Sequence, residues 1–145
     1  MNIFLGNNGH GKSNLLEAVY ILAIAKSLRA TNEREMVRWN SGYEEGFSQV
    51  AAILKHDGHP LQIAINLHCV GTNQDHPHLA NYSPSKLTIQ KNIKVNGLLC
   101  QASELVGKVT AVMFTAEDIQ LVIGSPPLRR RYLDILISQA DRHYL

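Results

Sequence analysis

"GNNGHGKS" occupies residues 6–13 and decides how the rest of the chain is interpreted. It fits the pattern Gly-x-x-x-x-Gly-Lys-Ser/Thr, in which glycines let the backbone curl and turn its N–H groups toward bound phosphates. Lys12 is placed to reach the terminal phosphates, and the Ser13 hydroxyl is placed to meet Mg²⁺. The pattern therefore predicts a site for a nucleoside triphosphate with Mg²⁺, formed by Gly6, Asn7, Asn8, Gly9, His10, Gly11, Lys12, Ser13 and Asn14.

The residues on either side of the loop provide the context that this motif requires. Residues 2–5, "NIFL", predict a short buried strand that runs into the loop. Residues 12 to about 27 predict a helix, because apolar side chains recur there at intervals of three and four. Since this helix is apolar on most sides, we expect it to be largely buried. A loop that opens a helix also presents the positive end of the helix dipole to a phosphate.

The motif alone does not choose among the protein classes that use it. A kinase, a GTPase and an ATP-driven clamp all share this spacing, although the Asn-Lys-x-Asp stretch with which a GTPase recognises its base is absent. A phosphotransferase acting on a small molecule therefore stays open beside an ATP-binding head. A third interpretation is a folded chain with no competent site. ATP-dependent dimerisation would favour the head, and a phosphorylated product would favour the phosphotransferase.

The middle of the chain, residues 46–99, predicts an antiparallel β subdomain. Asp57-Gly58 is a hairpin-turn signal between the first two of its apolar runs. The later runs alternate apolar and polar residues, as strands with one wet face do. Residues 71–85 are polar, contain two prolines and predict an exposed loop. The runs that predict strands are residues 47–56, 61–68, 86–92 and 93–97.

Helical patterns lie on both sides of this β-rich region. In the first of them Asn32 is a candidate N-cap, with Glu35 three residues on as in a capping box. In a later one Thr115 is the candidate cap and Gly124 the end. Residues 109–114, "VTAVMF", form a continuous apolar run that predicts a strand covered on both faces. The predicted helices comprise residues 32–40, one turn at 103–107, residues 115–124 and residues 125–145, the last with proline near its first turn.

The composition limits the classes of protein that need consideration. With 145 residues, 45% hydrophobic and 18% charged, the chain is about one domain with material for a core, and its net charge of +2 demands no polyanionic partner. Cys69 and Cys100 have no metal-like spacing and predict reduced thiols, and His76 and His78 flank a proline in a poor chelating arrangement. Without a signal peptide or a membrane-spanning run, a cytoplasmic location is expected.

Several stretches together resemble the RecF family, the DNA repair relatives of the SMC and ABC-type ATPases. The first stretch, residues 6–29, is close to that family's phosphate-binding loop, its Asn-Leu-Leu-Glu-Ala helix and its Ser-x-Arg. The last stretch, residues 112–134, resembles the family's run of Phe-x-Pro-Glu-Asp-Leu, Gly-Ser-Pro and Arg-Arg-x-x-x-Asp. This run is far more specific to the family than the loop alone. Their order and spacing agree, and the resemblance covers essentially the whole chain. The stretches are "GNNGHGKSNLLEAVYILAIAKSLR", "IKVNG" and "VMFTAEDIQLVIGSPPLRRRYLD".

This resemblance implies an α/β P-loop NTPase fold, specifically lobe I of an ABC/SMC-type head with an antiparallel β subdomain. On that basis residues 1–45 hold the P-loop strand and helices, residues 46–99 the β subdomain and residues 100–145 a further strand and helices of one ATP-binding lobe, 1–145. It also implies ATP and Mg²⁺ as cofactors, ATP-dependent dimerisation on DNA and weak ATPase activity. Recombinase loading at gaps, with recombination mediator proteins as partners, and a part in DNA replication, recombination, repair and the SOS response follow from the same resemblance.

The chain also departs from the family pattern. Only five residues precede Gly6, whereas family members begin with a strand and a Phe-Arg-like segment that helps to hold the base. Ser13 replaces the commoner Thr and keeps the hydroxyl, and Ala116 stands where the family usually has Pro. The resemblance places the signature motif, the Walker B acids and the second lobe beyond Leu145. We therefore expect an incomplete, N-terminal portion that binds nucleotide weakly and hydrolyses almost none.

Two further groups of residues carry functional hypotheses. By resemblance, Glu117 and Asp118 lie near a loop that senses the γ-phosphate and Mg²⁺. The alternative, which we favour, is the simple preference for acids at a helix start. Arg129 and Arg130, in the triple-arginine run, are candidate DNA contacts by resemblance. The alternative is a solvated helix start in which Arg130 and Arg131 pair with Asp134. Trp39 and the scattered tyrosines offer no aromatic platform for single-stranded bases.

Overall fold

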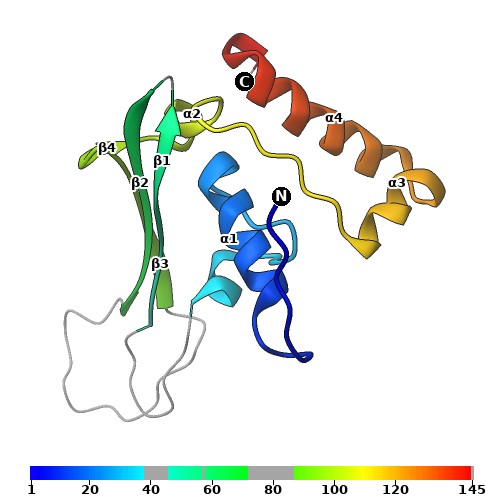
Figure 1. The fold of residues 1–145 in the computed structure, drawn as a ribbon, viewed down its shortest axis with the longest axis horizontal. Coiled ribbons are helices and arrows are strands. Elements are labelled where there is room, and N and C mark those ends of the chain that lie inside the picture. Colours follow the sequence, from blue (N-terminus) through cyan, green and yellow to red (C-terminus); the bar gives the residue numbers. More distant parts are fainter. Residues whose placement is uncertain (38–45, 57, 72–86, 145) are drawn as a thin grey trace. The chain divides into compact units, whose positions relative to one another are not determined.

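The computed structural model describes residues 1–37, 46–56, 58–71 and 87–144. Nearly all of the predicted exposed loop, together with Trp39 and Asp57 of the predicted turn, lies outside the described residues. The chain divides into two compact units (Figure 1). Unit 1 comprises Met1–Ser27 and Cys100–Leu145, and unit 2 comprises Leu28–Leu99.

Unit 2 contains the antiparallel layer expected for the middle of the chain. Its sheet has the order β1-β2-β3-β4, and both β1–β2 and β2–β3 pair antiparallel. The two separate runs predicted at 86–92 and 93–97 form one strand, because their alternation continues without interruption. The break falls instead at Asn96 and Gly97, whose φ angles of 49° and 83° suit a tight hairpin turn. The strands are β1 (Phe47–His56), β2 (His59–Gly71), β3 (Leu87–Val95) and β4 (Leu98–Cys100).

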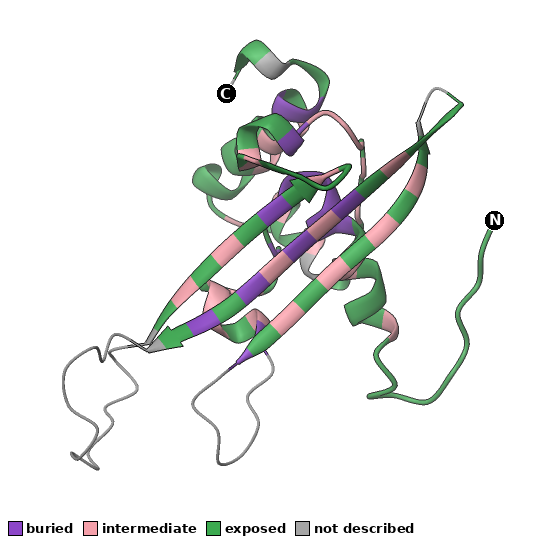
Figure 2. Cartoon of the chain, turned by 90° about the vertical axis from the view of Figure 1, so that its left-hand side faces the viewer, coloured by how far each residue is buried: buried purple, intermediate pink, exposed green. Residues whose placement is uncertain are grey.

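The two faces of the sheet differ in burial along every long strand (Figure 2). On β2 the buried positions are every second residue, Ile63, Ile65 and Leu67, and the side chains between them are more exposed. Cross-strand register continues the buried face, since Ile65 lies opposite Val50 of β1 and Ile93 of β3. The two-residue period of a strand therefore gives this sheet one apolar face and one open face.

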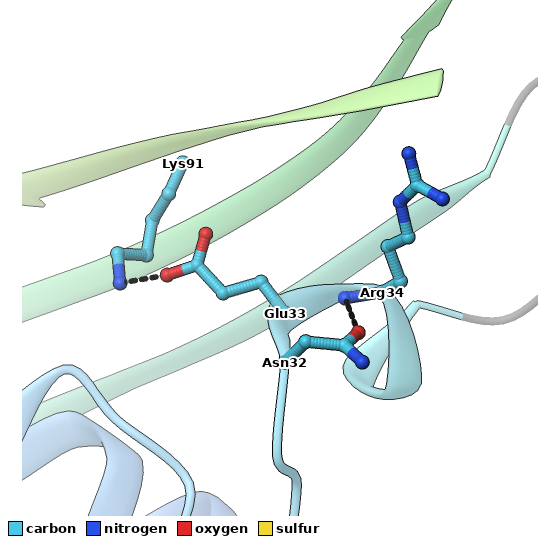
Figure 3. A network of polar contacts seen from close by, with 4 residues as sticks. All are labelled: Asn32, Glu33, Arg34 and Lys91. Carbon is cyan, nitrogen blue, oxygen red and sulfur yellow. Dashed lines mark hydrogen bonds and ion pairs between the residues drawn. The ribbon is translucent and has the colours of Figure 1, made fainter. Parts of the chain in front are cut away.

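A short 3₁₀ helix, η1 (Glu33–Met36), replaces the helix predicted over 32–40, of which residues 38–40 lie outside the described residues. Asn32 caps it as predicted, and its side chain accepts a 3.0 Å hydrogen bond from the Arg34 N–H. The Glu35 carboxylate accepts from the N–H of Thr31, one residue before the cap, at 2.9 Å. Glu33 forms an ion pair with Lys91, a lysine on the apolar face of β3 (Figure 3).

Unit 1 is built on helix α1 (Lys12–Ile24), which matches the predicted helix and ends at Ala25 in the left-handed conformation. Only its second half is buried, so the expectation of a largely buried helix is wrong for the first half. Leu15, Leu16 and Val19 remain 45%, 50% and 53% exposed. The buried half contributes Tyr20, Ala23 and Ile24 to a cluster that Val109, Ala111, Met113 and Ile135 complete.

Two predicted strands are not strands in the structure. Residues 2–5 are exposed and carry no ladder hydrogen bonds to any described strand, and a β-strand requires such a partner. Residues 109–114 are extended, but only alternate side chains face the cluster, and Val112 and Phe114 are 57% and 76% exposed. The Ala111 N–H donates to the side-chain oxygen of Gln139 at 2.9 Å rather than to a neighbouring strand.

The remaining predicted helices are present. A Gln101–Glu104 capping box opens the single turn α2, and Pro126 lies at the start of the longest helix. The helix predicted over 115–124 is a 3₁₀ turn followed by an α turn, and it ends at Gly124 as expected. These elements are α2 (Ala102–Leu105), η3 (Ala116–Ile119), α3 (Gln120–Ile123), α4 (Pro126–Ala140) and η4 (Arg142–Tyr144).

Candidate nucleotide-binding site

The glycine-rich loop immediately precedes α1 (Figure 1). Gly9 and Gly11 have φ angles of 84° and 81°, in the left-handed region that glycine adopts without strain. Gly11 is the N-cap of α1 and offers no side-chain acceptor to the first turn. The leading N–H groups of the helix, where the dipole is positive, are therefore left to an acceptor from outside the helix.

Lys12 folds back across this loop. Its ammonium donates to the carbonyl oxygen of Gly6 at 2.7 Å and to that of Asn7 at 2.8 Å. The two bonds hold the positive charge of Lys12 against the curl of the loop. Ser13 and Asn14 are exposed in the first turn of α1. The loop thus brings an ammonium, a hydroxyl and a free helix terminus together, and these donors fit a phosphate group and its magnesium ion.

The far end of α1 is secured by contacts that the sequence did not indicate. Buried Ser27 donates a hydrogen bond to the carboxylate of Glu17, one turn and a half along the helix. Tyr20 is buried, and this burial raises the pKa of its phenol, with smaller contributions from Tyr132 and Asp118. Arg131 opposes the shift. The helix that follows the loop is thereby fixed to the core of unit 1 by its C-terminal half.

Of the two candidate sensing acids, the structure describes the side chain of Asp118 only; that of Glu117 lies outside the described side chains. The Asp118 carboxylate accepts from the N–H of Thr115 and, at 3.2 Å, from its hydroxyl. This is helix-start capping, in line with the acid-preference explanation. Within the described part of the chain, no three His, Cys, Asp or Glu side chains gather as metal ligands.

The arginine run begins with a residue that serves the fold. Arg129 donates to the carbonyl oxygens of Leu121 and Val122, both at 2.8 Å, and to that of Gly124 at 3.1 Å. These are unpaired carbonyls at the end of α3, so Arg129 caps that helix. Sequence reasoning missed this role; the available signal was a cation just beyond a helix-ending glycine.

The predicted pairing of Arg130 and Arg131 with Asp134 is wrong. Among the described residues neither arginine forms an ion pair with Asp134. The Asp134 carboxylate instead accepts a 2.7 Å hydrogen bond from the hydroxyl of Tyr144 in η4, which raises the pKa of that phenol. The competing partner comes from a later turn, and intrahelical spacing cannot reveal it. Arg130 is exposed on α4.

Comparison with known proteins confirms the resemblance stated from the motifs. No family model matches the chain. In contrast, the proteins named DNA replication and repair protein RecF from Bacillus thuringiensis (strain Al Hakam), Bacillus cereus (strain B4264) and Bacillus anthracis (strain A0248) are each 36% identical over 146 aligned residues. The alignments cover 100% of this chain and 33% of each relative, so the chain spans about a third of the length of these proteins.

This similarity implies a P-loop fold of the ABC/SMC type, with which the mixed helices and antiparallel sheet are compatible. The chain is RecF-like over its whole length. None of the helices in the described ranges is both long and apolar enough to cross a bilayer.

Proposed function

We propose that this chain is the ATP-binding portion of a RecF-like protein of DNA replication and repair. The observation that supports it is the Lys12 ammonium held inside a curled glycine loop that opens α1, in a chain 36% identical throughout to proteins of that name. Cytoplasmic location, ATP-dependent dimerisation on DNA, recombinase loading with mediator proteins and a part in the SOS response belong to the same proposal.

In this proposal the residues of the loop hold Mg²⁺-ATP. The backbone N–H groups of Gly9, Gly11 and Lys12 donate hydrogen bonds to phosphate oxygens. The Lys12 ammonium exchanges its two carbonyl partners for the terminal phosphates. Ser13 supplies its hydroxyl to the ion, which neutralises phosphate charge when bound. The full site comprises Gly6, Asn7, Asn8, Gly9, His10, Gly11, Lys12, Ser13 and Asn14.

The proposed roles of the candidate sensing acids and of the candidate DNA-binding arginines depend on the contacts that the described side chains already make. Thr115 bonds a single oxygen of the Asp118 carboxylate, Oδ2, so the proposed sensing of a phosphate-bound ion falls to the other oxygen, Oδ1. The same role is proposed for Glu117. For DNA contact we favour Arg130 over Arg129, because the guanidinium of Arg129 is engaged by three carbonyl oxygens. Turnover by this chain is expected to be negligible, since hydrolysis requires acids that hold Mg²⁺ in addition to Ser13.

Thermal unfolding with Mg²⁺-ATP and in buffer tests the proposal. Ligand at about 100 times its dissociation constant adds about 2.7 kcal/mol of stability, or several degrees in Tm. The shift should vanish in Lys12→Ala and persist in Lys26→Ala, which removes an exposed lysine just beyond α1. An equal shift in Lys12→Ala, or none in the wild-type chain, contradicts the proposed site. Steady hydrolysis that Lys12→Ala abolishes would contradict the expected lack of turnover.

A further inference from the structure

The open face of the sheet in unit 2, called the outer face below, combines an aromatic pair, side-chain amides and lysines. Side chains on this outer face alternate with the buried ones along each strand (Figure 2). In register, Phe47 and Gln90 flank His68, and Gln49 and Asn92 flank Asn66. In the next row, Ala51 and Lys94 flank Ala64. The outer face comprises Phe47, Gln49, Ala51, Ile53, Lys55, Pro60, Gln62, Ala64, Asn66, His68, Val70, Thr88, Gln90, Asn92 and Lys94.

Its charge has one sign only. None of the residues of β1, β2, β3 and β4 is Asp or Glu, whereas Lys55, Lys91 and Lys94 are basic. Lys91 is on the opposite, apolar face and is paired with Glu33. Lys55 and Lys94 therefore give the outer face a positive potential that no strand carboxylate offsets. A merely solvated surface usually mixes both signs of charge.

An aromatic pair lies at one end of the face. The rings of Phe47 and His68 have centroids 4.8 Å apart and planes tilted by 45°, and Phe47 is 51% exposed. The scattered aromatic residues of the sequence gave no sign of a stacking platform. The pairing of β1 with β2 creates one, because it places these residues directly opposite each other. Exposed rings of this kind stack on unpaired bases whatever their sequence.

Side-chain amides continue the face beside the aromatic pair. Gln49 donates a 2.7 Å hydrogen bond to Asn66, and Asn92 lies across from Asn66 on β3. Each amide offers two donor hydrogens and two acceptor lone pairs, so this single bond leaves most of the hydrogen-bonding capacity of the row unused among the described residues. Amide groups of this type match the donor and acceptor edges of nucleobases.

We propose that the outer face binds a single nucleic-acid strand with its bases unstacked from one another. Bases stack on Phe47 and His68, the amide row contacts base edges, and the two lysines neutralise phosphates. A duplex suits the face less well, because a duplex hides its bases and presents mainly phosphates, for which two lysines are few. This inference rests on the proposed role on DNA and adds the surface that would receive the strand.

Fluorescence anisotropy with a labelled oligothymidylate of about 20 nucleotides tests the proposal, with oligouridylate of equal length and a duplex as competitors. Phe47→Ala should weaken binding about tenfold or more, and Phe47→Tyr, which keeps a ring, should restore it. Lys94→Gln should weaken binding and reduce the log–log salt slope by roughly 0.7. Lys26→Gln is the matched control outside the sheet and should change neither value.

Each outcome supports or overturns the proposal. Similar affinities for the DNA and RNA strands support the proposal. A higher affinity for one of them also supports it and identifies that nucleic acid as the ligand. Unchanged affinity in Phe47→Ala, an equal loss in Lys26→Gln or stronger competition by duplex overturns it. The Mg²⁺-ATP shift in Tm, measured on the same variants, separates the two proposals. A normal Mg²⁺-ATP shift in Tm without strand binding contradicts only the proposal for the outer face. Strand binding without a shift in Tm contradicts only the proposed nucleotide site.

Discussion

The Nε atom of Arg129 donates a 2.8 Å hydrogen bond to the carbonyl oxygen of Leu121, eight residues earlier. Because the same side chain also bonds Val122 and Gly124, it satisfies the carbonyls that the end of α3 leaves unpaired. Arg129→Ala should therefore lower the free energy of unfolding by roughly 1–2 kcal/mol. Urea denaturation followed by circular dichroism measures the loss.

The neighbouring Arg130 is the matched control. It is exposed and makes no ion pair with Asp134, so Arg130→Ala should change stability by less than about 0.5 kcal/mol. For DNA binding the expected order is reversed, with the salt-dependent loss in Arg130→Ala. Equal stability of the two variants would contradict the capping role of Arg129.

Gly124 is fixed by space and not by an unusual backbone angle. Its φ is −80°, yet a Cβ atom added there would lie 2.3 Å from the carbonyl oxygen of Gln120. Gly124→Ala should therefore destabilise the chain by about 1–3 kcal/mol, since backbone must move. Ser125→Ala is the control and should be nearly neutral, because the Ser125 side chain makes no cap hydrogen bond to α4. Thermal unfolding of both variants decides the matter.

The Glu33–Lys91 ion pair is only partly exposed, with 40% and 19% of the two side chains accessible. Glu33→Gln should cost about 1 kcal/mol, because it leaves the ammonium of Lys91 on the apolar face without its carboxylate. Lys91→Met should cost less, since an apolar side chain suits that face. A double-mutant cycle in urea should give a coupling energy of about 0.5–1.5 kcal/mol. Strictly additive effects would show that the pair contributes nothing.

Burial of Tyr20 makes stability sensitive to high pH. Its folded-state pKa lies above the ordinary 10.0, so the folded protein retains the phenolic proton more tightly than the unfolded chain. This contribution is complete below pH 10 and is lost as pH rises through the folded pKa. Tyr20→Phe should therefore flatten the fall in Tm above about pH 10 and leave Tm at pH 8 within a few degrees. If Tm falls equally with pH above about 10 in the wild-type chain and in Tyr20→Phe, Tyr20 is not the group responsible.

Local patterns predicted most helices because the information for them is local. The spacing of apolar residues after Lys12, Asn32 at a cap and Gly124 at a helix end each correspond to an element of the structure. Residues 2–5 and 109–114 had the apolar composition of strands and are not strands. Composition measures the tendency of a segment to be extended and buried, but a strand also needs a neighbour with which to pair.

For the candidate site, the sequence located the glycine loop, and the structure showed which groups the side chains of Lys12 and Arg129 contact. Lys12 was expected to face phosphates, and its two carbonyl partners show how it is held near them. The roles of Arg129 and Asp134 could not be predicted by helical spacing, because their partners lie in α3 and η4. Similarly, the pair of Phe47 and His68 depends on strand register, which brings together residues that are distant in the chain.

The sequence by itself determined the glycine loop, the helix that follows it, the alternating strands and the similarity to RecF proteins. Backbone conformation, side-chain period and motif spacing are properties of neighbouring residues, so they can be inferred without coordinates. Only the tertiary structure decided which half of α1 is buried, that Arg129 caps α3 and that one sheet face carries amides, an aromatic pair and lysines without a carboxylate. These features arise from packing and register between segments that are far apart in the chain.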